Sequence, residues 1–375
     1  MSFELVEDAI KSAIAEGVFP GAVLLVRQGE QFFYLRAFGH RCLLPAPSPM
    51  QEDTIFDLAS LTKPLATTFA VMLLVQEGKL RLDDRVSRVF PNFGVHGKSQ
   101  VTFRHLLSHR SGLPAWRPYY QDVLREQQLA GRVNFLASPE AKSFVYQTIF
   151  REQLEVEPDR EAIYSDVGFM LLGAAVEQIA AAPLDRVCNE RIFKPLGLRK
   201  TGFVDLSLLR GRRLEPVTQM IAATEHCPWR QKVLCGEVHD DNAYAMGGVA
   251  GHAGLFSCAR EIDVLLCALE EAYRRVGGLV AQRIVREFWT RDGHLPDSTW
   301  CLGWDTPSPS QSAAGRYFSP NSVGHLGFTG CSIWIDLERN LHVILLTNRV
   351  HPSRENEKIR EFRPVIHDLI GEALA

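Results

Sequence analysis

The chain has 375 residues, 46% of them hydrophobic and 23% charged, which is typical of a globular protein and excludes a disordered or fibrous one. Its formal net charge is −3 and its basic residues are scattered, so neither nucleic acid nor an anionic membrane is an expected partner. The length is sufficient for two cooperating lobes.

The first predicted elements are a helix and a hairpin. Residues 3–16 place apolar side chains at helical spacing with acids between them, which predicts an amphipathic helix. The acidic residues stand where a secretory signal would be basic, so we expect a cytoplasmic protein. The apolar runs 21–27 and 31–38 flank turn residues 28–30 and predict a β-hairpin.

The middle of the chain is predicted to be mostly helical. Residues 60–77 predict a helix with a mostly apolar body that ends at Gly78. Pro64 is tolerated near its start, because the amides of the first helical turn have no hydrogen-bond partners to lose. Residues 168–182 give the clearest buried helix. No apolar run reaches the length of a membrane span without a charge or a glycine.

Strand patterns return late in the chain. Residues 332–336 and 341–347 flank a four-residue turn and predict a second hairpin, and a final amphipathic helix follows at about 356–374. Strands at both ends with helices between them predict one sheet built from both termini, with a helical lobe inserted.

The first group that can carry chemistry is Ser60-Leu61-Thr62-Lys63. Residues three apart on a helix share a face, so the Lys63 amine can reach the Ser60 hydroxyl. A lysine whose pKa is lowered by burial can act as the base that serine needs to become a nucleophile. The spacing alone is a weak signal, because a helix-capping serine followed by a surface lysine gives the same Ser-x-x-Lys pattern.

Two further groups are candidates. Tyr164-Ser165-Asp166 precedes the buried helix, where a tyrosine can relay a proton; a packed tyrosine before an N-cap is the alternative, and Tyr120-Gln121-Asp122 has the same spacing. His325-Leu326-Gly327-Phe328-Thr329-Gly330 precedes the late hairpin, and its small residues would let a substrate lie along a strand edge. A glycine-rich turn with an incidental histidine is the alternative there.

Other polar groups are given structural interpretations. The eight cysteines form neither a C-x-x-C pair nor a zinc-ligand spacing, and we expect reduced, mostly buried thiols. Residues 238–242 and His252 are rich in ligand-type side chains without metal-site spacing, so a hydrogen-bonded loop is expected and no metal. We expect His109 to shape a loop beside the pocket. No cofactor-binding motif is present.

In this order and context the three groups resemble the serine β-lactamase and penicillin-binding-protein superfamily, on the branch of class C β-lactamases, D-aminopeptidases and related esterases. The resemblance spans nearly the whole chain: ASLTK at 59–63, LLSHRSGLP at 106–114, YSDVGFMLLG at 164–173, GGVAGHAGLFS at 247–257, LGW at 302–304, HLGFTG at 325–330 and LLTNR at 345–349. It implies an α+β, β-lactamase/transpeptidase-like fold with an antiparallel sheet flanked by helices. The predicted sheet lobe is 1–59 and 243–375, the mostly helical lobe 60–242, and the active site their junction.

The resemblance also implies roles for residues. Ser60 would be the acylated nucleophile, Lys63 its proton acceptor and Tyr164 the group that shuttles protons to the leaving group; which of the last two is the principal base stays open. The amides of Ser60 and Phe328 would form the oxyanion hole. His325 and Gly327 occupy the third motif, and Asn348 and Arg349 follow the last strand, where some relatives hold a substrate carboxylate.

Two departures from the family pattern bear on the substrate. Asp166 stands where asparagine is usual, and an ionised Asp166 would stabilise a charged Lys63 and disfavour an anionic substrate. His325 stands where many members have lysine, and it carries little charge at neutral pH. Both changes weaken the case for β-lactam hydrolysis and favour esters, amides or D-amino-acid peptides of modest charge.

The sequence therefore predicts a serine hydrolase that acts through a Ser60 acyl-enzyme on a small ester, amide or D-amino-acid peptide. A β-lactamase or penicillin-binding DD-peptidase is the alternative within the superfamily. From a different class, a sensor of muropeptides or β-lactams that binds without turnover remains an alternative. No cofactor is implied by any of these.

Overall fold

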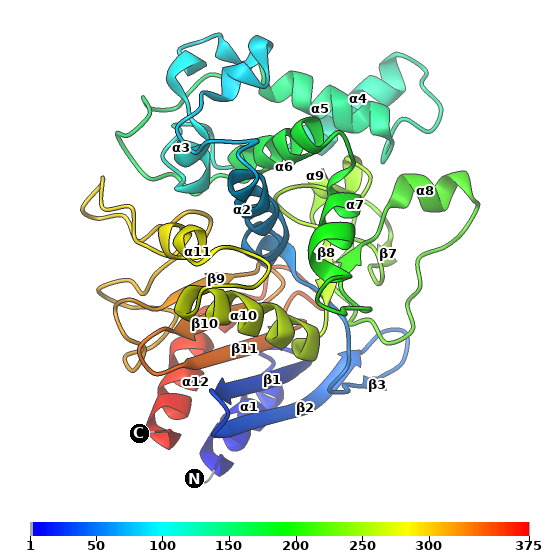
Figure 1. Ribbon diagram of the computed structural model, residues 1–375. Helices are drawn as coiled ribbons and strands as arrows, with labels where there is room; N and C mark the ends of the chain where they lie inside the picture. The colour runs from blue at the N-terminus through cyan, green and yellow to red at the C-terminus, as the bar shows by residue number, and fades with distance from the viewer. Residues whose placement is uncertain (1–2, 375) are drawn as a thin grey trace.

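A six-stranded antiparallel sheet forms the base of the molecule in a computed structural model that describes residues 3–374 (Figure 1). Its strand order is β3-β2-β1-β11-β10-β9. Strand β1 pairs with β11 along its length, so the two ends of the chain meet in the centre of the sheet. The strands are β1 (Gly21–Gln28), β2 (Phe32–Cys42), β3 (Ser48–Pro49), β9 (Val323–Leu326), β10 (Ser332–Asp336) and β11 (Leu341–Thr347).

Helices cover both faces of this sheet. Helices α1 (Glu4–Ala15) and α12 (Ile359–Ala373) pack on each other and share a hydrophobic cluster with one face of the central strands. Helix α10 (Ala259–Arg274) contacts β1 and β11 from the other face. Both hairpins and both terminal helices lie within a few residues of the predicted ranges, and the predicted α+β antiparallel architecture is confirmed.

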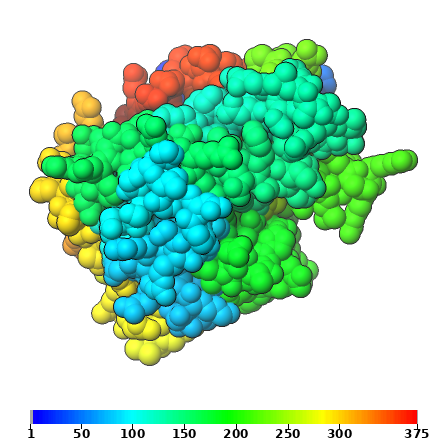
Figure 2. Space-filling model, turned by 90° about the horizontal axis from the view of Figure 1, so that it is seen from above, coloured from blue at the N-terminus to red at the C-terminus, as the bar shows by residue number. Residues whose placement is uncertain are grey.

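The rest of the chain forms a mostly helical region above the sheet, and its middle segments fill the view from above (Figure 2). The division of the chain at residues 59/60 and 242/243 stays a prediction. The helices are α2 (Phe69–Gln76), α3 (Phe103–Leu107), α4 (Tyr119–Leu129), α5 (Pro139–Ile149), α6 (Asp166–Ala180), α7 (Leu184–Cys188), α8 (Leu206–Gly211), α9 (Asp241–Ala245) and α11 (Gln282–Phe288). Short strands form two small sheets, β4 (Phe56–Asp57) with β8 (Leu255–Ser257) and β5 (Gly202–Phe203), and β6 (His226–Cys227) with β7 (Lys232–Val233).

The helix predicted from Ser60 is not uniform. It begins as a single 3₁₀ turn at Ala59–Leu61, continues as a π-helical segment at Lys63–Thr68 and becomes α2 only at Phe69. Pattern reasoning could not find this change, because the apolar side chains that bury the segment suit any of the three helix types. The π-helical stretch is of a kind that recurs at functional sites.

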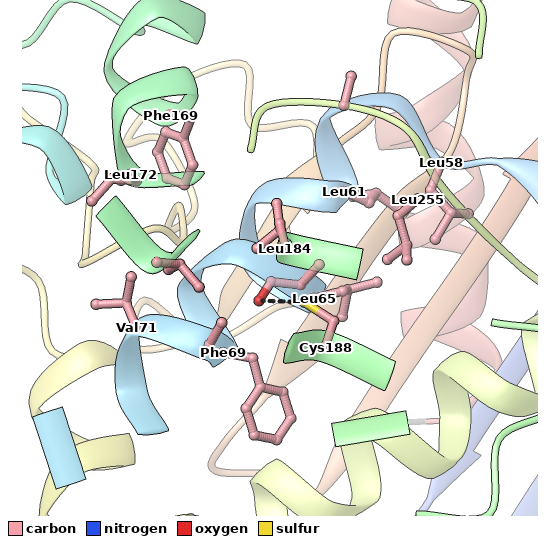
Figure 3. Packing of buried hydrophobic residues seen from close by; sticks show 14 of the residues in the cluster. Leu58, Leu61, Leu65, Phe69, Val71, Phe169, Leu172, Leu184, Cys188 and Leu255 are labelled. Carbon is pink, nitrogen blue, oxygen red and sulfur yellow. Dashed lines mark hydrogen bonds between the residues drawn. The ribbon is translucent and has the colours of Figure 1, made fainter. Parts of the chain in front are cut away.

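This composite helix passes through the hydrophobic core (Figure 3). Leu61, Leu65 and Phe69 are buried there among side chains of α6 and α7. The 18-residue window Ala59–Gln76 is long and apolar enough to cross a membrane by composition alone, but 83% of it is buried inside the protein. Its hydrophobicity is thus accounted for by a core position.

A buried ionic cluster lies between α10 and the sheet, at the end of β11 that is remote from Thr347. The His342 ring is fully buried and contacts the carboxylates of Asp263 and Glu270, each at 2.8 Å. Burial lowers the pKa of His342, but the two carboxylate contacts outweigh it and the pKa is raised. The pKa of Asp263 is lowered: burial opposes this, and the hydrogen bonds from Arg27 and His342 prevail.

These shifts predict how the cluster's contribution to stability depends on pH. A raised histidine pKa stabilises the fold below the unfolded value of about 6.5 and ceases to do so as pH rises through the folded value. A lowered aspartate pKa stabilises above about 3.9 and ceases to do so as pH falls through its folded value. The cluster should therefore contribute most between about pH 4 and 6.5.

Replacing His342→Ala should leave two buried carboxylates without their shared partner and lower the free energy of unfolding by about 3–5 kcal/mol at pH 6. The deficit should be smaller at pH 9 than at pH 6, because the contribution of the raised His342 pKa is lost as pH rises through its folded value. Urea unfolding at both pH values measures this, with exposed His226→Ala as control. An equal deficit at the two pH values would contradict the assignment.

Candidate active site

Ser60 lies at the mouth of the core helix on a tightly held turn. Ala59, just before it, has a left-handed backbone with φ of 47°, a strained conformation of the kind that clusters at functional sites. The buried carboxylate of Asp57 holds the turn by accepting the amide of Ala59 at 2.9 Å and that of His239 at 2.6 Å. The nucleophile therefore projects from a backbone whose shape is fixed from two sides.

Lys63 is completely buried, and its amine has two hydrogen-bond acceptors and one ionic partner. The amine donates to Ser60 Oγ at 2.8 Å and to the His252 carbonyl at 3.2 Å, and it pairs with Asp166 Oδ1 at 2.7 Å. Burial lowers the pKa of Lys63, but the charges and hydrogen bonds of Asp166 and Tyr164 outweigh it and the net shift is upward. Of the two effects that the sequence suggested, lowering by burial and stabilisation of the charge by Asp166, the second therefore prevails.

Tyr164 and Asp166 are brought to this amine by the start of α6. Ser165 caps the helix by accepting the Gly168 amide, and Asp166 is its first residue. The Tyr164 hydroxyl lies next to Lys63 and Ser60; burial raises the pKa of Tyr164, and the charge of Lys63 partly offsets this. The predicted trio of nucleophile, lysine and tyrosine is therefore brought together by the structure, whereas Tyr120, of the decoy spacing, lies on α4.

Aromatic rings fix the position of Tyr164. Trp300 stacks on it with ring centroids 5.4 Å apart, and the His109 ring packs against it at 4.8 Å. His109 Nδ1 also accepts the Ser165 amide at 3.0 Å, and burial holds the pKa of His109 well below its usual value. His109 thus acts as a neutral support behind the tyrosine, in the loop where the sequence placed it.

The third motif ends β9 and begins the turn into β10. Burial and the charge of Lys63 lower the pKa of His325 to about 3, so the ring is neutral at physiological pH. Its Nδ1 hydrogen-bonds the Leu326 carbonyl at 2.8 Å. A Cβ on Gly327 would lie 2.6 Å from the Leu58 carbonyl oxygen, so only glycine lets this turn approach the backbone just before Ser60.

The Phe328 amide is placed to receive an oxyanion. Among residues 3–374 it donates to no acceptor, although its ring is half exposed in the pocket. The Thr329 hydroxyl donates to the Asp57 carbonyl at 2.8 Å and so joins the turn to the nucleophile strand. A donor with no partner at rest is what an oxyanion hole needs.

Asn348 and Arg349 are placed differently from each other. The Asn348 side chain accepts the Gly21 amide and donates to the carbonyls of His40 and Arg41, so it fastens β1 to β2 and does not line the pocket. Arg349 lines the pocket, but its guanidinium donates to three backbone carbonyls, including that of Phe328 at 2.8 Å. The Asn348 side chain is thus engaged within the fold, and of the Arg349 guanidinium only Nη2 has no acceptor among residues 3–374.

These groups surround a cavity of about 610 Å³. Its charged groups are largely paired: Arg354 with Asp241 and Glu225, Asp240 with His252. Half-exposed Trp116 and Phe328 supply apolar surface. The wall is formed by Ala59, Ser60, Trp116, Tyr164, Asp166, His239, Asp240, Asp241, His252, Ala253, Trp300, Asp305, His325, Leu326, Gly327, Phe328, Arg349, Arg354, Glu357, Ile359, Arg360 and Arg363.

Sequence reasoning missed several of these residues. His252 was expected to belong to a hydrogen-bonded loop, and its ring does pair with Asp240 at 2.9 Å, but the contact of its carbonyl with Lys63 was not foreseen. Trp300 stands just before the LGW segment, which was quoted without it. Arg363 has no local signal at all, because an arginine on an amphipathic helix is normally exposed; here it is 6% exposed.

An acyl-transfer site of the Ser-x-x-Lys type, on a sheet flanked by helices, defines the class of protein. A family model described as Beta-lactamase matches residues 6–365. The chain belongs to this family, within the serine β-lactamase and penicillin-binding-protein-like superfamily.

Relatives and solved structures agree with this assignment. A protein of Escherichia coli K12 named "Putative D-alanyl-D-alanine carboxypeptidase" is 35% identical over 89% of this chain and 79% of its own length. The hydrolase EstCE1, described as having promiscuous acyltransferase activity, is 24% identical with a TM-score of 0.74, covering 98% of this chain and 97% of its own. A penicillin-binding protein homologue from Pyrococcus abyssi is 21% identical with a TM-score of 0.72, covering 99% and 78%. The last two likenesses establish the fold.

The position of Asp166 predicts a shift in the pH dependence of activity. Its negative charge raises the pKa of both Lys63 and Tyr164, so Asp166→Asn should lower both, whichever of them accepts the proton. The acid limb of kcat/KM for an ester should then move down by about 1–3 pH units.

The measurement is a pH–rate profile from the acid to the alkaline range with a short-chain p-nitrophenyl ester. Asp122→Asn is the matched control, because Asp122 follows Tyr120 at the same spacing but pairs with Arg125 on α4. An acid limb unchanged by Asp166→Asn would contradict the proposed electrostatic link.

Proposed function

We propose that the protein is a serine hydrolase that cleaves small, uncharged esters and amides, D-amino-acid derivatives included, through a Ser60 acyl-enzyme. The observation that carries the proposal is the contact of the buried Lys63 amine with Ser60 Oγ at 2.8 Å, beside Tyr164, at the mouth of the cavity. A buried amine on a serine hydroxyl has little structural purpose, because it places a cation in the core at considerable cost.

The proposed reaction follows the superfamily pattern. In the reactive form the Lys63–Tyr164 pair has given up one proton to solvent, as a neutral amine or a phenolate; the Ser60 oxygen then bonds to the acyl carbon while its own proton passes to that vacant site on the pair. The negative charge on the former carbonyl oxygen is received by the Ser60 and Phe328 amides. The proton then moves to the leaving oxygen or nitrogen as its bond to the acyl carbon breaks, and water repeats these steps to release the acid.

The charges of the pocket support an uncharged substrate. Asp166 lies in the pocket wall within contact of Lys63, and His325 supplies no positive charge. Asn348 is outside the pocket, and the guanidinium of Arg349 is held by carbonyls. A carboxylate entering here would lose hydration, and the Arg349 guanidinium, with three of its five N–H groups already engaged by carbonyls, offers it only a reduced return.

A DD-carboxypeptidase is the second candidate, and the named relative at 35% identity favours it. Such an enzyme acts on a peptide that ends in a free carboxylate. The two candidates share the acyl-enzyme and differ in how they treat that carboxylate, so one substrate pair separates them.

The acyl-enzyme is tested by time-resolved intact mass spectrometry. A short-chain p-nitrophenyl ester should give a transient adduct with release of product, and Ser60→Ala should give neither, with little loss of stability. A penicillin offered in parallel should react slowly or not at all. Full activity in Ser60→Ala would overturn the assignment, and a lasting penicillin adduct without turnover would favour the sensor.

The substrate charge is tested with N-acetyl-D-alanyl-D-alanine and its terminal amide, which differ only in the carboxylate. For the proposed function we expect kcat/KM values within about threefold of each other, because no charged hydrogen bond is made to the terminus. A carboxypeptidase should prefer the free acid by more than about tenfold, the usual effect of a charged hydrogen bond. That preference would replace the first candidate with the second.

Location in the cytoplasm is part of the same proposal. All eight cysteines are free thiols, and five of them are buried. Reduced thiols of this kind are usual in a reducing compartment.

A further inference from the structure

The turn that carries the Phe328 amide is held from behind by a buried arginine. Arg363, on α12, is 6% exposed and donates through Nη2 to the Gly327 carbonyl at 3.0 Å and to the Cys331 carbonyl at 2.9 Å. Among residues 3–374 no carboxylate lies within 4 Å of its guanidinium. Burial lowers the pKa of Arg363 to about 10, which still leaves it charged at physiological pH.

The Gly327 carbonyl that Arg363 contacts belongs to the same peptide group as the proposed oxyanion donor, the Phe328 N–H. Gly327 C=O and Phe328 N–H are the two ends of one amide, and the N–H is the proposed oxyanion donor. A charged donor on the oxygen of an amide polarises it and makes its N–H a stronger donor, since hydrogen bonds in a chain reinforce one another.

The peptide group of the other proposed oxyanion donor, the Ser60 amide, also has a side-chain hydrogen bond to its carbonyl oxygen. The Ser60 N–H shares its peptide group with the Ala59 carbonyl, and that carbonyl accepts the Thr62 hydroxyl at 2.6 Å. Thr62 Oγ1 in turn accepts the Leu255 amide at 3.0 Å, so the hydroxyl is fixed toward Ala59. Each of the two peptide groups therefore has a side-chain donor on its oxygen.

We propose that Arg363 is a positioning residue for catalysis, which strengthens and orients the Phe328 amide as an oxyanion donor through its hydrogen bond to the Gly327 carbonyl. This rests on the proposed function, because it requires an oxyanion to form beside Ser60. Arg349 supports the turn one residue further on, through the Phe328 carbonyl. A substrate carboxylate is not needed to explain why Arg363 lacks an acidic partner.

The test compares Arg363→Met, which removes charge and donors at similar length, with Arg363→Lys, which keeps the charge. Acylation by a p-nitrophenyl ester should slow about 10- to 100-fold in Arg363→Met, less than the ~100- to 1000-fold expected for losing an oxyanion donor outright. KM should change less than about threefold, since the ground-state ester has no oxyanion to bind. Arg363→Lys should recover part of the rate.

A spectroscopic reading separates this role from a purely structural one. The infrared carbonyl stretch of a ¹³C-labelled acyl-enzyme reports the hydrogen bonds to that oxygen, and it should move to higher wavenumber in Arg363→Met and partly return in Arg363→Lys. Arg27→Gln is the control: it removes an arginine that pairs with Asp263 at the remote ionic cluster and should alter stability without moving the band or the acylation rate.

The outcomes are distinguishable. If the wild-type protein shows the acyl band, and folded Arg363→Met shows the same band frequency and the same acylation rate, the inference is overturned and the proposed function stands. No acyl band on Ser60 in the wild-type protein overturns both. If Arg363→Met does not fold, Arg363→Gln takes its place, because it keeps a single neutral donor; a wild-type rate and band there also overturn the inference.

Discussion

The ion pair between Lys63 and Asp166 is the constraint on which the site depends. A completely buried ammonium is costly unless each of its protons has an acceptor and its charge has a partner. Here the acceptors come from three parts of the chain: Ser60 beside it, the His252 carbonyl after α9, and Asp166 at the start of α6. The contacts of one buried amine therefore bring together Ser60, the start of α6 and the loop that contains His252.

The second constraint is the close approach of the β9–β10 turn to the strand before Ser60. It requires a glycine at 327, and it is maintained by Thr329 on the Asp57 carbonyl and by Arg363 from α12. The Thr329 contact joins residues that are 272 apart in the sequence. The pairing of β1 with β11 makes these contacts possible, because it places the two ends of the chain in one sheet.

Local patterns predicted the two hairpins, the terminal helices and the trio of Ser60, Lys63 and Tyr164, because each depends on spacing or on a motif. They did not predict the π-helical segment after Ser60, whose geometry is imposed by packing around it. They left the direction of the Lys63 pKa open, because burial lowers it and an ionised Asp166 would raise it. Only the fold shows that Asp166, over 100 residues away in the sequence, contacts the amine and that the pKa is raised. Arg363 and Asn348 show the same limit, since only tertiary contacts distinguish a buried support from a surface or substrate-binding side chain.

The two constraints place different charges: the first concerns the Lys63–Asp166 ion pair, and the second concerns the charge of Arg363. The Lys63–Asp166 pair is neutral as a unit, so the acid–base side of the pocket presents little net charge to an entering substrate. The positive charge that has no acidic partner, on Arg363, is proposed to act on the Phe328 amide through the Gly327 carbonyl that it contacts. It acts most strongly when an oxygen at the Phe328 amide becomes negative, which occurs in the transition state and not in a neutral ester. Such an arrangement favours the transition state over the bound substrate, which is the condition for raising kcat.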